Sequence, residues 1–493
     1  MNYLTKHKSN YNAKNNLFAI SDSILAVAKM LSKINTVQVS DTTVFNSIGE
    51  AGNITMIFPK KAVMKLLVVI FFFISAYSFG QQPLRLDSAI NIALKNSYDI
   101  EVARNNVEIN SINNNYGVAG GLPVVDGSVA TNEQVTNVNQ KLNTGTHIQR
   151  KNAAANSGSA GLSGTMLLYN GMRVVATKKR LAELEKQNKE YLNSTIENTI
   201  ATVMTQYYDV VRQQSYMRTL DTSIAVETKQ LNIVQTQVNV GLANNADLFQ
   251  TQLDLNSLIQ QKQSQQLIID QAKTTLLTTL TLKPDSAVFI EDTIIVDSTL
   301  MLENVLDNVN RSPDIIAANM QVTINQLLEK ETAAQRYPSV YANAGYNYNR
   351  SQTAAGNVLL NQNYGPYIGL SMTVPIYNGG IYKRQQRVAQ INTTNAQLQQ
   401  NILVRDNTSA AVKNYQAYEN SLQQLQTQRE SYALAKQLLD LVLLKFQLRV
   451  ATIVDVKNAE QSFEDAGYLL VNLSYTAKAA EIEMKRLTNQ LSF

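Results

Sequence analysis

The chain has 493 residues, no cysteine, no tryptophan and only two histidines. The lack of cysteine excludes disulfide bonds, iron–sulfur clusters and cysteine-ligated zinc, and two histidines disfavour a Ser-His-Asp triad or a multi-histidine metal site. The chain has 43 lysine and arginine residues and 38 aspartate and glutamate residues, but eight of the basic and three of the acidic residues lie within residues 1–80. The remainder is neutral, which gives no support for nucleic-acid binding.

A secretory signal peptide is predicted over residues 64–80. A lysine-rich flank precedes an uncharged run from Leu66 to Phe79, and Ser78 and Gly80 are small residues at the two cleavage positions. This run of about 14 residues is short for a membrane-spanning helix, which needs about 20. Residues 1–63 show no clear periodicity, so we interpret them as a non-native upstream extension and expect the mature protein to begin near Gln81.

The rest of the chain is an internal duplication. Residues 161–171 recur as 369–379, at an offset of 208 and with seven identities in eleven. Apolar residues repeat every seven positions from Val404 to Phe446, and the positions 208 earlier, from Ile196 to Val238, are apolar too. A repeat of seven sustained over this length predicts a supercoiled helix that packs against other helices.

Alternating segments predict strands between the helices. Residues Val340–Asn349 and Tyr367–Ile376 alternate apolar with mostly polar side chains, and Val124–Thr131 and Ala160–Tyr169 are the weaker equivalents in the first repeat. This alternation is typical of transmembrane β-strands. A barrel needs at least eight strands, so several chains must close one barrel together. A plain coiled-coil stalk with two soluble hairpins is the alternative.

After the signal peptide, the chain is predicted to contain a helix, a hairpin, a very long helix and a return helix, and this order occurs twice. It resembles the TolC family of outer-membrane efflux proteins. The resemblance is carried by the strand-to-helix signals Tyr169–Gly171 and Tyr377–Gly380 and by the tip segments Val238–Asp247 and Phe446–Asp455. It implies a mainly α fold with a small β part. A long α-helical coiled-coil tunnel would adjoin a transmembrane β-barrel shared between subunits, with four strands from each chain.

The resemblance also implies a function. The protein would be a passive homotrimeric channel in the outer membrane of a Gram-negative bacterium, with a periplasmic tunnel. It would serve a tripartite efflux or type I secretion system, with a periplasmic adaptor (membrane fusion) protein, an inner-membrane pump and outer-membrane lipid as partners. No catalytic residue, cofactor, metal or nucleic acid is expected. The alternative is a secreted coiled-coil structural scaffold or adhesin.

An enzyme is the third class of function and the least supported. Acidic residues stand singly along helix faces that we expect to be solvated, and no phosphate-binding or dinucleotide fingerprint occurs. His147 is predicted to lie alone in a polar loop.

The expected organisation follows the duplication. The first repeat covers 81–281, a belt segment 282–303, with short apolar runs, would surround the tunnel, and the second repeat covers 304–493. The expected elements are the β-hairpins 124–169 and 339–377, the long helices 171–240 and 379–449, and the return helices 244–281 and 452–488.

Three groups of residues are candidates for function. The periplasmic aperture would be formed by Asp247, Phe446, Arg449, Asp455 and Asn458. The tip turns would contain Gly241, Asn244 and Thr452, and the junctions between barrel and tunnel would contain Pro123, Gly171, Pro338, Pro375 and Gly379.

The second tip departs from the family pattern. Family members usually have a glycine and then, two residues later, an arginine, whereas this chain has Arg449 and Ala451. Asn458 stands where a second acid can occur, so the latch arginine and the two-tier acidic ring of the family are altered. Helix capping is a simpler role for the two tip aspartates, because Asn244 and Thr452 each lie three residues before one of them.

Overall fold

The computed structural model describes residues 35–39, 42–47, 54–59, 83–355 and 358–491. The chain divides into two units, residues 1–82 and 83–493. In the first unit, β1 (Asn35–Val39), β2 (Thr42–Ser47) and β3 (Ile54–Pro59) form an antiparallel sheet, which the sequence analysis did not predict. The predicted signal peptide, 64–80, lies outside the described residues.

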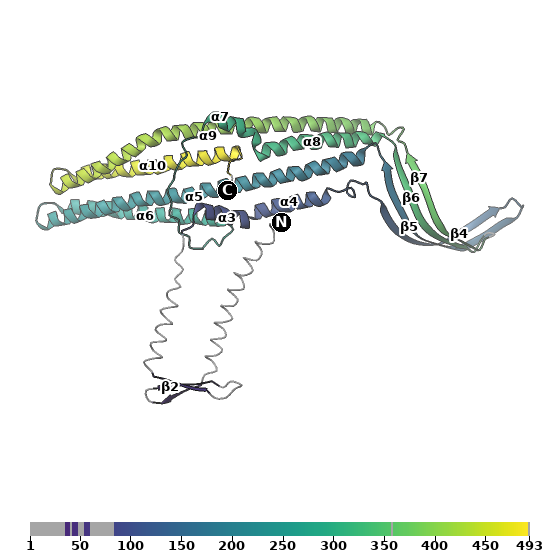
Figure 1. Cartoon of the computed structure of the whole chain (residues 1–493), viewed down its shortest axis with the longest axis horizontal. Helices are drawn as coiled ribbons and strands as arrows, with labels where there is room; N and C mark the ends of the chain where they lie inside the picture. The colour runs from purple at the N-terminus through teal and green to yellow at the C-terminus, as the bar shows by residue number, and fades with distance from the viewer. Residues whose placement is uncertain (1–34, 40–41, 48–53, 60–82, 356–357, 492–493) are drawn as a thin grey trace. The chain divides into compact units, whose positions relative to one another are not determined.

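The second unit contains two helical hairpins of equal size. Helices α5 and α9 each have 67 residues, or about 100 Å at 1.5 Å per residue, and the return helices α6 and α10 each have 35. Both tips lie at the same end, on the left in Figure 1. The helices are α3 (Leu86–Asn96), α4 (Tyr98–Asn113), α5 (Arg173–Asn239), α6 (Asn245–Thr279), α7 (Leu302–Asn308), α8 (Pro313–Ala333), α9 (Ile381–Gln447) and α10 (Ile453–Leu487), with short 3-10 turns at Val309–Arg311 and Ala334–Arg336.

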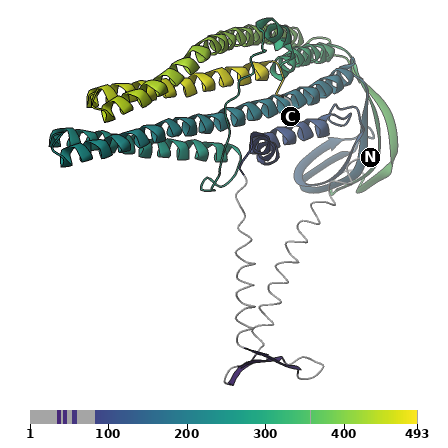
Figure 2. The same cartoon turned by 60° about the vertical axis from the view of Figure 1, so that its left-hand side comes forward.

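The heptad residues form the core between these helices. In α9, Ala411, Tyr418, Leu439 and Phe446 are all buried, and Val203 and Val210 are the buried counterparts of the first two in α5. Helix α5 packs against α6, α8, α4 and α10, and α9 packs against α10 and α8. Figure 2 shows the two hairpins as separate pairs that run side by side. The predicted long helices, packed against other helices through their heptad residues, are therefore confirmed.

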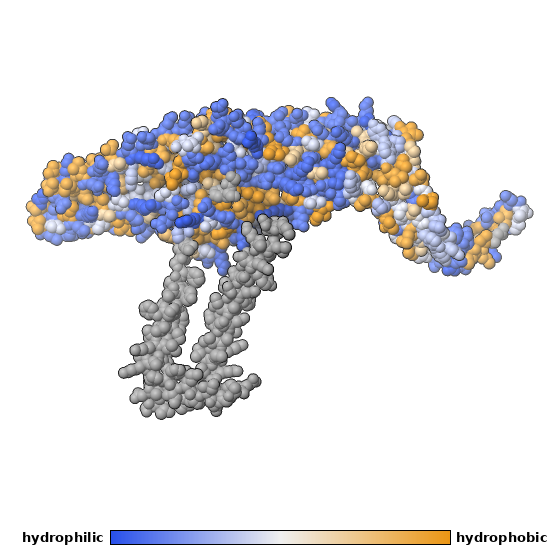
Figure 3. Space-filling model, in the orientation of Figure 1, coloured by the Kyte–Doolittle hydropathy of each residue, from blue (hydrophilic) through white to orange (hydrophobic). Residues whose placement is uncertain are grey.

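A four-stranded antiparallel sheet follows at the other end of the long helices (Figure 1). Its order is β4 (Val124–Lys141), β5 (His147–Tyr169), β6 (Ser339–Thr353) and β7 (Leu360–Thr373). The register places apolar residues opposite one another across all strands, as in the row Val125, Gly164, Ala344 and Ile368, and polar residues on the other face. In the view of Figure 3, hydrophobic residues gather over the part of the sheet nearest the helices, whereas hydrophilic and hydrophobic residues are mixed over the helical body.

The strands differ from the prediction at their ends. β4 extends past Thr131 to Lys141, and β5 begins before Ala160, at His147. His147 is therefore the first residue of β5 and does not lie in a loop. Its Nε2 atom lies 2.6 Å from Oδ1 of Asn139. β7 ends at Thr373, before Pro375. Proline has no N–H group for the ladder, so the strand does not continue through it.

The belt segment forms no helix or strand between residues 285 and 301. It is attached to both repeats by hydrogen bonds. The Tyr207 hydroxyl of α5 donates to Asp292 at 3.1 Å, and the Lys485 ammonium of α10 donates to Asp297 at 3.2 Å. Its apolar runs pack against the helical core, with Val288 and Ile294 against the first repeat. Among the described helices, none is both long enough and apolar enough to cross a membrane.

Candidate functional site

The two helical tips have the same backbone geometry. At each tip the helix ends in a Schellman motif, in which two backbone N–H groups beyond the helix bond back to its last turn. At the first tip Leu242 N donates to Gln237 O at 2.7 Å, and at the second Val450 N donates to Lys445 O at 2.8 Å. The residue with positive φ is Gly241 at the first tip, with φ of 74°, and Arg449 at the second, with φ of 62°.

The return helices begin with side-chain caps at both tips. The Asn244 side chain accepts from Asp247 N at 2.8 Å, and the Thr452 hydroxyl accepts from Asp455 N at 3.2 Å. At the second tip the Asp455 carboxylate also accepts from Thr452 N at 2.8 Å, which completes a capping box. Hydrogen bonds from Thr452, mainly from its backbone N–H and secondly from its hydroxyl, hold the pKa of Asp455 below its usual value. The predicted caps are therefore present.

The other candidate aperture residues differ in burial. Phe446 is buried against Val234, Leu248 and Val456, so its side chain contributes to packing and is not exposed at the tip. Asn458 and Arg449 are exposed. Within the described part of this single chain, Arg449 takes part in no ion pair.

The junctions between sheet and helices are also duplicated. Gly171 and Met172 in the first repeat, and Gly379 and Gly380 in the second, have positive φ between 66° and 75°. A Cβ atom on Gly171 would lie 2.5 Å from Cβ of Tyr337, whereas one on Gly379 would meet nothing within 4 Å. Only the first junction therefore needs glycine for close packing as well as for its backbone conformation.

The prolines stand where the chain enters or leaves the sheet. Pro123 directly precedes β4 and Pro338 directly precedes β6, while Pro375 lies in the irregular segment between β7 and α9. Each is outside the hydrogen-bonded ladder, which is where a residue without N–H fits.

Three buried acids contradict the expectation that the acidic residues lie on solvated helix faces, and one of them, Glu481 of α10, pairs with Lys478 and Lys485. Glu227 of α5 is 2% exposed and Glu460 of α10 is 6% exposed. Burial raises the pKa of Glu227 to about 7 and, together with the nearby charge of Glu227, that of Glu460 to about 8. Hydrophobic periodicity does not predict this contact, because the buried face of α5 is polar here.

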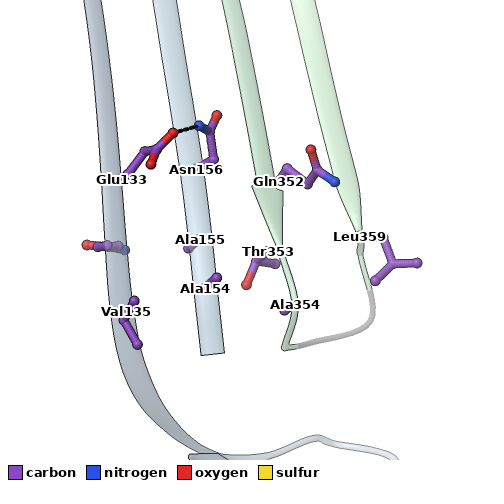
Figure 4. A pocket seen from close by; sticks show the side chains of 10 residues that line it. Glu133, Val135, Ala154, Ala155, Asn156, Gln352, Thr353, Ala354 and Leu359 are labelled. Carbon is purple, nitrogen blue, oxygen red and sulfur yellow. Dashed lines mark hydrogen bonds between the residues drawn. The ribbon is translucent and has the colours of Figure 1, made fainter. Parts of the chain in front are cut away.

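A cleft lies between the ends of the two β-hairpins. Its volume is about 560 Å³, and Glu133 is the one charged residue among the described residues that line it, where it accepts from Asn156 Nδ2 at 3.0 Å (Figure 4). One carboxylate provides neither an acid–base pair nor a metal site. Throughout the described residues, no group of three or more His, Asp or Glu side chains is placed to hold a metal ion.

Comparisons with known proteins agree with this architecture. The model of the family described as outer membrane efflux protein matches residues 89–281 and 307–490. The outer membrane protein TolC of Vibrio cholerae is 21% identical over 366 residues, which cover 71% of this chain and 82% of that protein.

Solved structures share the fold. The outer membrane protein VceC of Vibrio cholerae has a TM-score of 0.68 and 18% identity, over 82% of this chain and 95% of that chain. The open state of the MtrE outer membrane channel of Neisseria gonorrhoeae has a TM-score of 0.65 and 18% identity, over 83% of this chain and 90% of that chain.

Proposed function

The chain belongs to the outer membrane efflux protein family, and on that premise we propose that three copies of it form one passive channel across the outer membrane and the periplasm. In this proposal the channel is the exit of a tripartite efflux or type I secretion system. A periplasmic adaptor protein and an inner-membrane pump are its partners, and it catalyses no reaction.

The two-faced sheet with two free edges supports this proposal most directly. β4 and β7 are the outer strands, and no other described strand pairs with their outer sides. Lipid does not tolerate such edges, because their N–H and C=O groups would lack partners. If β7 of one copy pairs with β4 of the next, three copies of four strands give a closed barrel of twelve.

The helical hairpins give the proposed channel its tunnel. α5 and α9 run from the sheet to a common end, and α6 and α10 return from that end beside them (Figure 1). Three copies would surround one axis with twelve long helical segments, continuous with the barrel. The belt segment would lie around the middle of this tunnel.

We place the closed periplasmic mouth at the turns 241–247 and 449–455. Three copies of Asp455 around one axis would make a narrow ring of negative charge that attracts cations. Arg449 is exposed at the same tip and unpaired within the described part of its own chain, so it is available to hold a carboxylate of a neighbouring copy, such as Asp247. It would replace the latch arginine that is usual in the family.

Engineered disulfides test the shared barrel, because the chain itself has no cysteine. Ser128→Cys on β4, combined in turn with Asn363→Cys, Gly365→Cys or Tyr367→Cys on β7, samples three registers on the polar face of the sheet. We expect one register to give covalent dimers and trimers, but nothing larger, after oxidation of outer membranes. The single-cysteine variants are the controls. A ladder that continues beyond trimers, or no cross-link in any register, would contradict closure by three copies.

The scaffold or adhesin alternative predicts a different behaviour. A peripheral coiled-coil protein is released from membranes by urea, whereas a barrel requires detergent. Membrane fractionation followed by recording in planar bilayers therefore separates the two, since only the channel conducts.

We also propose that residues 1–63 are absent from the exported protein and that cleavage occurs near Gln81. N-terminal mass spectrometry of the outer-membrane form tests this, because peptides from 1–63 on that form would contradict it.

A further inference from the structure

A polar seam joins the two helical hairpins near their tips, where α5 packs against α10. The helices approach closely, since a Cβ atom on Gly467 of α10 would lie 2.7 Å from the Thr219 side chain of α5. The buried side chains of α5 along this seam are spaced by four, four, three and four residues, and they are Thr219, Ser223, Glu227, Gln230 and Val234. Their buried counterparts on α10 are Val456, Ala459, Glu460, Phe463 and Gly467.

Two carboxyl groups in this seam each have one oxygen that is buried without a partner. Oε1 of Glu227 and Oε1 of Glu460 are both buried without a hydrogen bond, and so is Oε1 of Gln230. All three side chains are more than nine-tenths buried. Oγ of Ser223 is likewise buried without a hydrogen bond, and it is the one O–H donor among these groups. Three acceptors with at most one donor are costly in the interior, and a proton on a carboxyl would supply a further donor that ionised carboxylates cannot.

The surrounding charges add to this cost. Asp254 of α6 and Glu464 of α10 face the pair with negative charge, and Lys457 of α10 opposes them. The Lys457 ammonium, however, donates to Asp254 at 2.7 Å, so part of its charge is already compensated. Burial comes first in raising the pKa of both Glu227 and Glu460, and the negative neighbours add to it.

The duplication shows that this pair is not required by the coiled-coil pattern. At the offset of 208, Thr219 and Ser223 have the identical counterparts Thr427 and Ser431. Glu227, in contrast, corresponds to Ala435, and Glu460 corresponds to Gln252. Some seam positions thus persist across the repeats, whereas Gln230 corresponds to Leu438 and neither glutamate has an acidic counterpart.

We propose that Glu227 and Glu460 form a proton-binding pair that locks the α5–α6 hairpin to the α9–α10 hairpin and releases it when both carboxyls ionise. A proton turns one carboxylate into an O–H donor, which the other carboxylate or the Gln230 side chain can accept. Loss of that proton leaves two like charges in a buried contact, and their repulsion separates the helices.

The direction of the pH dependence follows from the raised pKa values. The folded chain holds protons on both glutamates that the unfolded chain, with a carboxyl pKa of 4.5, has lost. The seam is therefore most stable at low pH, weakens as pH rises above about 4.5, and is fully ionised above about 8. Separation of the hairpins at the tips would open the mouth of the channel, a consequence that depends on the function proposed above.

Spin-label distances test the lock without relying on conduction. Leu242→Cys and Val450→Cys place labels on the two exposed tips of one chain, and excess unlabelled chains dilute the labelled chain in the assembled protein. We expect the distance distribution between the tips to lengthen from about pH 5 to about pH 9, a range that brackets both raised pKa values.

Glutamine variants identify the groups responsible. Glutamine resembles a protonated glutamate in size and carries no charge, so the double variant with Glu227→Gln and Glu460→Gln is expected to keep the short distance at both pH values. Glu430→Gln removes a charge from an exposed site on α9 and should leave the response intact. No lengthening in the parent protein, or equal loss of the response in the Glu430→Gln control, would overturn the proposal.

Conductance in planar bilayers separates this inference from the proposed function. If the distances respond to pH but no ions are conducted at any pH, the channel proposal fails and the proton lock stands. If ions are conducted but the distances do not respond, the lock fails and the channel proposal stands.

Discussion

At the tip of the first repeat the left-handed backbone position is occupied by Gly241, whereas the same position in the second repeat is occupied by Arg449. The sheet-to-helix junctions show the reverse, with Met172 in the first repeat and Gly380 in the second. A side chain at such a position costs about 1–2 kcal/mol relative to glycine. The backbone has thus stayed the same after duplication, while the residue that bears the strain differs. Under the proposed role of Arg449 at the closed mouth, its charge explains why a strained non-glycine residue stands at the second tip.

The largest loss of stability is expected from substitutions on the sheet, and equivalent substitutions in the two repeats should cost the same. Leu162 and Leu370 are equivalent and lie on the apolar face, and their neighbours Ser163 and Ser371 lie on the polar face. Leu370→Lys or Leu162→Lys should each destabilise the assembled protein by about 2–4 kcal/mol if the apolar face meets lipid near the midplane. Ser163→Lys and Ser371→Lys should be mild. Urea unfolding in lipid vesicles measures this, and equal damage on both faces would mean that the faces are assigned wrongly.

The junction glycines should distinguish the repeats. Gly171→Ala combines left-handed strain of about 1–2 kcal/mol with overpacking of about 1–3 kcal/mol, because its Cβ atom would meet Tyr337. Gly379→Ala carries the strain alone, since nothing lies within 4 Å. Thermal unfolding of the two variants is the measurement. If both lose the same stability, the contact with Tyr337 has no energetic consequence.

Exchange of the residues at the tips should shift stability in opposite directions. Arg449→Gly removes left-handed strain and should stabilise the fold by about 1 kcal/mol, whereas Gly241→Arg should destabilise it by a similar amount. Under the proposed role of Arg449 in the closed mouth, Arg449→Gly should nevertheless raise the resting conductance. A variant that is more stable and conducts like the parent would show that Arg449 does not hold the mouth closed.

The caps should give the smallest effects. Thr452→Ala and Asn244→Ala each remove a side-chain cap and should cost about 1 kcal/mol, whereas Thr452→Ser keeps the hydroxyl and serves as the control. Asp455→Ala should lower the melting temperature only slightly, but it should reduce cation selectivity in planar bilayers if Asp455 lines the mouth. Unchanged selectivity would leave capping as the function of this carboxylate.

Much of the fold could be predicted because it repeats with a fixed period. The heptads from Val404 to Phe446 predicted the buried face of α9, and the alternation in Val340–Asn349 predicted β6. Asn244 and Thr452 predicted the starts of the two return helices. In each case the interaction lies within one element or within one turn, so the spacing in the sequence is sufficient to determine it.

The extra length of β4 and β5 could not be predicted in the same way. Beyond the row where Ala155 pairs with Thr353, these strands form a two-stranded ribbon that β6 no longer covers. With no core on either face, their side chains need not alternate, and the polar stretch around His147 resembles a loop. Pairing between the two strands decides the structure there.

By itself, the sequence determined the duplication, the coiled-coil face and the two-faced strands, because periodic burial leaves a periodic pattern of apolar residues. Only the tertiary structure decided that Tyr337 meets Gly171 and that Glu227 and Glu460 share a buried seam. These contacts join residues far apart in the chain, and the buried seam is polar. Hydrophobic periodicity therefore gives no sign of them, and only the packing of α5 against α10 removes the two carboxyls from water.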